Sequence, residues 1–258
     1  MQAVALCESG ALEEYGITPQ ELAVICASHN GQPEHVALVD GILRKAGLSA
    51  QDLLCGAQYP IHEETKRDMI RRGLPPDCLH CDCSGKHAGM LLTAKHYGED
   101  LSAYANPDSP TQQRIIQIIC HLCGCSPQEI IQAVDGCGVP VHALPLFKLA
   151  QGYARMSRPE ALGEVRSRAV RRIVCAMTEY PFEVAGTGRL CTAPVQQVRR
   201  RLLLRNRAAG SGHRHRSQAG GRLFRVYARR GPGASHPAGC DLQSRVVPAG
   251  GLLGPQHL

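Results

Sequence analysis

The sequence lacks tryptophan and contains only three phenylalanines among 258 residues. A chain of this length can bury a substantial core, and with so few aromatic side chains that core must be mainly aliphatic. No run of roughly 18 apolar residues occurs, so the sequence predicts no membrane-spanning helix. Residues 1–8 carry no basic segment of the kind that opens a secretion signal. We therefore expect a cytoplasmic chain.

Lysine is absent after Lys148, and the charge is unevenly divided. Residues 1–194 contain 17 Lys and Arg against 21 Asp and Glu, whereas residues 195–258 contain 12 Arg and a single acid, Asp241. The composition indicates one body, 1–194, and a basic tail, 195–258, without helical or strand periodicity. One interpretation of the tail is a disordered arm that binds nucleic acid through its arginines. We prefer the other, a GC-rich gene translated out of frame, because such codons then give Arg, Gly, Ala and Pro.

Thirteen cysteines without a secretion signal favour reduced thiols and metal ligands over a disulfide framework. Two triplets share one spacing, which is typical of a structural zinc or iron–sulfur module: Cys78-x-x-Cys81-x-Cys83 and Cys120-x-x-Cys123-x-Cys125. A zinc-binding structural protein that uses these triplets is therefore one hypothesis. For the second triplet we prefer a helix end with buried small side chains.

Capping signals and apolar periodicity predict most of the helices. Thr18-Pro19-Gln20-Glu21 is a capping box with proline at the first helical position, and Ser28 should lie just past that helix. Residues 130–134 fit either a helix or a strand that leads into the turn at Asp135. The other helices are expected over residues 2–15, 33–46, 90–97, 110–122 and 159–178.

Residues 82–89 (Asp-Cys-Ser-Gly-Lys-His-Ala-Gly) hold a thiol, a hydroxyl, an amine and an imidazole in succession. Because a helix is expected to follow, Cys83, Lys86 and His87 should lie on its first turn, where the helix dipole favours a thiolate or a bound anion. Gly85 and Gly89 would let another backbone come close. An ordinary helix N-terminus with a buried cysteine is the alternative interpretation.

Four segments in the same order carry a family resemblance: 26–35 (Cys-Ala-Ser-His-Asn-Gly-Gln-Pro-Glu-His), 83–90 (Cys-Ser-Gly-Lys-His-Ala-Gly-Met), 135–140 (Asp-Gly-Cys-Gly-Val-Pro) and 185–189 (Ala-Gly-Thr-Gly-Arg). Together they resemble the asparaginase II-type L-asparaginases, the thermolabile bacterial kind with a serine/lysine active site and a zinc ion. The resemblance covers roughly residues 2–192.

The resemblance implies an α/β fold of the serine β-lactamase/glutaminase-like kind, with a sheet flanked by helices and incomplete in this chain. It implies hydrolysis of the side-chain amide of L-asparagine to L-aspartate and ammonia. The resemblance places Ser28 in a serine/lysine relay, in which a neutral lysine accepts the proton of a serine hydroxyl. The implied Zn²⁺ ligands are Cys83, Lys86 and Cys137, with His29, Asp135 and His87 in contact with the substrate or behind the ligands.

The sequence departs from the family in two places. It contains no Ser-x-x-Lys motif, in which the family carries its primary nucleophile just before the segment that matches residues 2–6. Met1 therefore looks like an internal methionine of a longer ancestor. It also lacks the catalytic lysine that the family carries after Gly188. We therefore expect slow hydrolysis or none. The implied partner is L-asparagine; a homodimer is compatible with the sequence, a membrane is not expected, and nucleic acid is a disfavoured partner.

Overall fold

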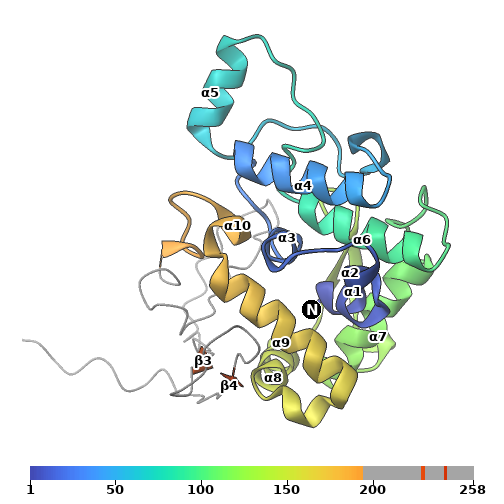
Figure 1. The fold of residues 1–258 in the computed structure, drawn as a ribbon. Coiled ribbons are helices and arrows are strands. Elements are labelled where there is room, and N and C mark those ends of the chain that lie inside the picture. Colours follow the sequence, from blue (N-terminus) through green and yellow to red (C-terminus); the bar gives the residue numbers. More distant parts are fainter. Residues whose placement is uncertain (194–227, 230–240, 243–258) are drawn as a thin grey trace, which may run out of the picture.

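Figure 1 shows the computed structural model, which describes residues 1–193, 228–229 and 241–242. The expected tail, 195–258, lies outside the described residues apart from two short strands. These are β3 (Ala228–Arg229) and β4 (Asp241–Leu242), which pair antiparallel.

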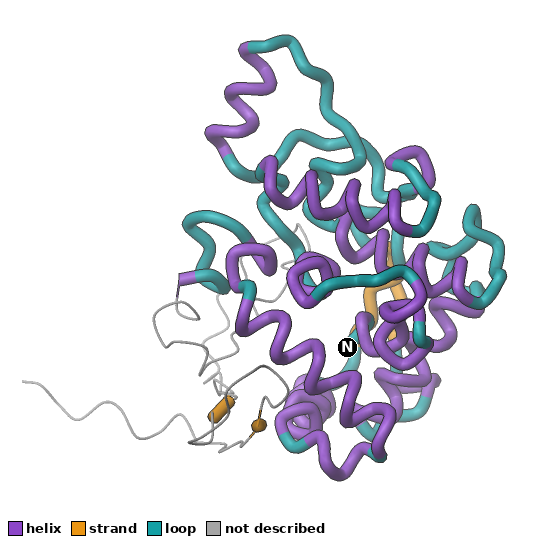
Figure 2. The backbone as a smooth tube through the Cα atoms, in the orientation of Figure 1, coloured by secondary structure: helices purple, strands orange, loops and turns teal. Residues whose placement is uncertain are grey.

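The described part of the chain is mostly helical. Figure 1 and the tube in Figure 2 show α3 in the interior between α4, α6 and α9, whereas α5 projects at one edge. The α-helices are α1 (Ala3–Ser9), α2 (Ala11–Glu14), α3 (Pro19–Ile25), α4 (Pro33–Lys45), α5 (Glu63–Arg71), α6 (Ser84–His96), α7 (Pro110–Cys123), α8 (Leu146–Ser157), α9 (Glu164–Glu179) and α10 (Pro181–Ala185). Short 3-10 turns occupy Ala50–Asp52, Pro127–Glu129 and Pro159–Leu162.

A small antiparallel hairpin completes the body. Strand β1 (Ile131–Val134) pairs with β2 (Pro140–Ala143), with Ile131 opposite Ala143 and Val134 opposite Pro140. The open question at residues 131–134 is thus resolved in favour of a strand. Both α and β elements are present, but the described residues form only two-stranded sheets. The broad layered sheet implied by the resemblance is not seen among them.

Two expected helices are each interrupted by a glycine with positive φ. The helix expected over residues 2–15 breaks into α1 and α2 at Gly10, whose φ is 95°. The helix expected over residues 159–178 becomes a 3-10 turn and α9, separated by Gly163 at φ 79°. Left-handed backbone suits glycine, so these residues end helices that side-chain periodicity alone would continue.

Other local predictions are confirmed. The capping box at Thr18 is formed by both of its hydrogen bonds, and α7 ends at Gly124 in a left-handed cap as expected. The core is aliphatic, and Tyr104 is the aromatic member of its largest fully buried side chains. No helix in the described residues is long and apolar enough to cross a bilayer.

Candidate active site and metal centre

Two glycines bring helices α3 and α6 into close contact. A Cβ atom on Gly85 would lie 2.4 Å from the carbonyl oxygen of Val24, and one on Gly89 would lie 2.5 Å from Cγ2 of Ile25. Both contacts are shorter than side chains permit, so only glycine allows this approach. The close backbone approach expected at residues 85 and 89 is therefore present, and its partner is the last turn of α3.

This packing places Ser28 beside the first turn of α6. Ser28 follows α3 and Cys83 is the N-cap residue of α6. The Ser28 Oγ atom lies 3.8 Å from the Cys83 Sγ atom, although the two residues are 55 positions apart in the sequence. The serine that the resemblance places in the relay and one implied metal ligand thus lie next to each other.

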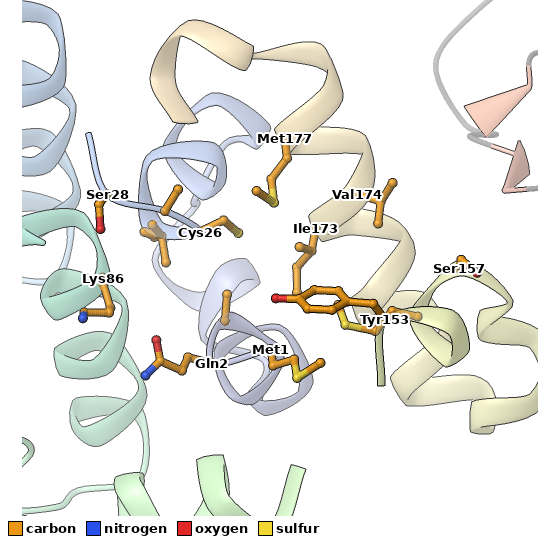
Figure 3. A pocket seen from close by; sticks show the side chains of 14 residues that line it. Met1, Gln2, Cys26, Ser28, Lys86, Tyr153, Ser157, Ile173, Val174 and Met177 are labelled. Carbon is orange, nitrogen blue, oxygen red and sulfur yellow. The ribbon is translucent and has the colours of Figure 1, made fainter. Parts of the chain in front are cut away.

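Ser28 and Lys86 line one cavity of about 120 Å³. Figure 3 shows them on the same side of the cavity, with the Gln2 amide below them. The opposite wall comes from α8 and α9 and is largely apolar: Tyr153, Met156, Ile173, Val174 and Met177. The cavity therefore combines a polar wall, which contains a hydroxyl and an amine, with an apolar wall.

A second cluster adjoins this cavity and contains the expected metal ligands. One ligand atom each from Cys83, Asp135 and Cys137 lie within 4.8 Å of one another. The Lys86 Nζ atom lies 3.4 Å from the Cys137 Sγ atom and 3.6 Å from Oδ2 of Asp135. Lys86 thus contacts this cluster and also lines the cavity. The structure brings Cys83, Lys86 and Cys137 together, with Asp135 added.

Burial and charge oppose each other at Lys86. Burial lowers the pKa of its ammonium group, but the two thiols and the carboxylate beside it raise the pKa above its ordinary value. The contact with Cys137 lowers the pKa of Cys83, whereas the Cys81 thiol and burial raise it, to about 11 in balance. The Cys83 thiol and burial raise the pKa of Cys137 to about 12. Without a bound metal, a protonated Lys86 therefore neighbours two protonated thiols at neutral pH.

His87 lies behind the thiol cluster and is fully buried. Its Nδ1 atom is 2.7 Å from the hydroxyl of Tyr104, which also accepts a hydrogen bond from the backbone N–H of Leu54. The Nε2 atom of His87 is buried without a hydrogen-bonding partner among the described residues, and the proximity of this ring lowers the pKa of Cys137. His87 thus lies behind the ligands, as the sequence implied.

His29 does not line the cavity, although a contact with the substrate was one of its expected roles. It is fully buried and hydrogen bonds to Ser84. Sequence reasoning also missed three residues of the site. Gln2 and Tyr153 line the cavity, and Tyr104 holds His87. None of the three stands in a motif. Tyr153 lies on α8, where helical periodicity could have drawn attention to it, but Gln2 precedes α1 and Tyr104 lies in a turn.

The cysteine triplets do not gather as triplets. Within the described residues, the group of three His, Cys, Asp or Glu ligands that lies close enough for a metal is Cys83 with Asp135 and Cys137. In the second triplet, Cys123 is buried at the end of α7 beside the Met1 sulfur, while Cys120 and Cys125 pack against the core. The preferred interpretation of that triplet, a helix end with buried small side chains, agrees with this placement.

A comparison with models of known protein families assigns most of the chain to one family. The model of the family described as L-asparaginase II matches residues 1–220, most of the chain and part of the expected tail. No curated protein matches the sequence.

Proposed function

Because this chain belongs to the L-asparaginase II family, we propose that it is an amidohydrolase that converts L-asparagine and water to L-aspartate and ammonia. The observation that carries the proposal is the shared cavity, which both Ser28 and Lys86 line. We also propose that the α/β body is of the serine β-lactamase-like kind that the family resemblance implies.

The proposed reaction uses Ser28 as the nucleophile. Its Oγ atom attacks the carboxamide carbon of asparagine, and the proton of its hydroxyl passes to the carboxamide nitrogen. The C–N bond then breaks, and ammonia leaves an ester on Ser28. Water attacks this ester, which releases aspartate and restores the hydroxyl.

Lys86 supplies positive charge on the same wall of the cavity. Its pKa is raised by the neighbouring thiols and carboxylate, so it carries a proton at neutral pH in the metal-free protein. A cation that lines the same cavity as the proposed nucleophile can bind the substrate carboxylate or stabilise the negative charge that develops on the carbonyl oxygen. With a side chain only 17% exposed, its charge is weakly screened by water.

The thiol cluster fits Zn²⁺ by its donor chemistry. Cys83 and Cys137 offer two sulfur ligands of the kind that zinc prefers, and Asp135 adds an oxygen ligand. Lys86 would be a further ligand if its amine lost its proton. A bound zinc would keep both thiols deprotonated and act as a Lewis acid. His87 lies behind these ligands and would orient them.

The test is the release of ammonia and aspartate from L-asparagine by the purified chain. We expect Ser28→Ala to lower turnover at least about 100-fold, because removal of a nucleophile disables the groups that act with it. Ser102→Ala is the matched control, since Ser102 is exposed and bonds only to the Asp100 turn. We expect low turnover in every case, because the sequence has no Ser-x-x-Lys motif.

Two results would contradict the proposal. Equal turnover by Ser28→Ala and the unchanged chain would exclude Ser28 as the nucleophile. Absence of any ammonia release, in a chain shown to be folded and loaded with zinc, would mean that this family member does not hydrolyse asparagine. A parallel assay with glutamine, whose side chain is one methylene longer, would show which of the two amides the protein prefers.

A further inference from the structure

The side chain of His29 connects the two segments that form the polar wall of the cavity. Its backbone N–H donates to the carbonyl of Asp82 at 3.0 Å. Its Nε2 atom lies 3.0 Å from the Ser84 hydroxyl. Ser28 precedes His29, and Cys83 separates Asp82 from Ser84. Both hydrogen bonds therefore join the residue after the proposed nucleophile to the two residues that flank a proposed metal ligand.

The hydrogen-bond pattern fixes the position of the proton on this ring. The Nδ1 atom of His29 accepts from the backbone N–H of Gly31 at 3.1 Å, so the proton of the neutral ring is on Nε2. That N–H donates to the Ser84 Oγ atom, and the Ser84 hydroxyl in turn donates to the carbonyl of Leu79. The network is complete with a single neutral tautomer.

His35 stacks on the His29 ring and makes a similar pair of hydrogen bonds. The two imidazoles are stacked, with centroids 4.9 Å apart and planes within 6°. The Nδ1 atom of His35 accepts from the backbone of Gln32, and its Nε2 atom donates to the carbonyl of Phe182. Both histidines are fully buried. They differ in the acceptor of the Nε2 proton, which for His29 is in the site and for His35 is in α10.

We infer that His29 is a positioning residue, which holds Ser28 in place against the first turn of α6 through its Nε2–H···Oγ bond to Ser84. This inference rests on the proposed function of Ser28. The bond matters because Ser84 lies next to Cys83 and two residues before Lys86, so it sets the spacing between the nucleophile and the cation. A misplacement of about 1 Å in such a group can reduce turnover about 100-fold.

Three variants separate this bond from the stacking and burial of the ring. His29→Asn keeps an acceptor for the Gly31 N–H but loses the reach to Ser84. His29→Gln keeps a donor that can reach Ser84. His35→Asn is the matched control, because it makes the same loss in the same stack but breaks a bond to Phe182 instead.

The first measurement is kcat and KM for asparagine. We expect His29→Asn to lower kcat by about 10–100-fold with little change in KM, because substrate contacts stay in place while Ser28 shifts. His29→Gln should recover most of kcat, and His35→Asn should keep it within about threefold. Equal losses of kcat in His29→Asn and His35→Asn would overturn the inference, since any break in the stack would then be equivalent.

The second measurement requires no turnover. Iodoacetamide is applied to the metal-free folded chain, and the rate of Cys83 alkylation is measured by mass spectrometry relative to Cys123, which is buried elsewhere. We expect His29→Asn to raise this ratio at least tenfold and His35→Asn to leave it unchanged. If the unchanged chain releases no ammonia but Cys83 responds this way, the proposed function fails and the positioning role stands. If Cys83 responds equally in both variants, the positioning role fails whatever the activity.

Discussion

Two regions of opposite character meet at the site. Ser28, Cys83 and Lys86 come from the contact between α3 and α6, where two glycines allow close packing. Asp135 and Cys137 come from the turn between β1 and β2. All four residues of β1 are exposed, including 73% of Ile131 and 71% of Val134.

The contrast between the α3–α6 contact and the β1–β2 hairpin shows how the fold holds the residues that each of them contributes to the site. Ser28, the proposed nucleophile, and Lys86 are placed by elements that also build the core, so their positions are fixed together with the fold. The hairpin delivers two ligand groups from the turn that follows its exposed first strand, and Lys86 contacts both of them. Substitutions in the first region should therefore affect stability and site together, whereas substitutions in the hairpin should affect the metal cluster alone.

The largest effect is expected for Gly85→Ala. Its Cβ atom would lie 2.4 Å from the Val24 carbonyl oxygen, which is backbone and cannot move aside. We expect a loss of about 3 kcal/mol or more in the free energy of unfolding, the upper end for overpacking. Gly136→Ala in the hairpin turn is the control, because nothing lies within 4 Å of its added atom. Denaturant titration of both variants measures the difference, and equal stabilities would remove the contrast between the regions.

The next effect concerns the metal. Cys137→Ser should weaken zinc binding at least about 100-fold, since it removes one of two thiolate ligands. Cys123→Ser should leave zinc binding unchanged, because that thiol lies at the end of α7 beside Met1. Competition with a chromophoric chelator gives both affinities. Equal losses would show that zinc binds through the cysteine triplets and not at the junction with the hairpin.

Motifs with a local physical cause could be predicted from the sequence. The capping box at Thr18 and the glycine stop at Gly124 both formed as expected, because each depends on residues within one turn. The assembly of Cys83, Lys86 and Cys137 followed from the family resemblance and not from their spacing, since Cys137 lies 51 residues after Lys86.

Features that depend on tertiary contacts could not be predicted. Gly10 and Gly163 interrupt helices whose apolar pattern continues across them, because the pattern carries no information on φ. Tyr104 holds His87 from a turn that has no motif. The assignment of residues 131–134 was ambiguous because five or fewer residues fit both periods, and pairing with β2 decided it.

An intermediate effect is expected on acidification. Burial lowers the pKa of His29 from 6.5 to about 3. Between these values the unfolded chain binds a proton that the folded chain does not, so stability falls as the pH falls, by about 1.4 kcal/mol per pH unit. Above pH 6.5 the His29 ring is neutral in both the folded and the unfolded chain, so its burial then causes no loss of stability. His29→Gln should flatten the slope of unfolding free energy against pH, and Gly136→Ala should not. Identical slopes in all three proteins would mean that His29 is not buried as a neutral ring.

The smallest effect on the free energy of unfolding is expected for a substitution in β1, the exposed strand of the hairpin. Ile131→Thr keeps a β-branched side chain at a residue that is 73% exposed, so unfolding free energy should change by less than about 0.5 kcal/mol. The same substitution at Ile25, which is 4% exposed and packs on Gly89, should cost about 2 kcal/mol or more, because it removes a buried methyl group and buries a hydroxyl. Denaturant titrations of the two variants compare the regions with identical chemistry. A loss above about 1 kcal/mol at Ile131 would show that β1 is covered in solution, and the hairpin would then be as firmly held as the contact between α3 and α6.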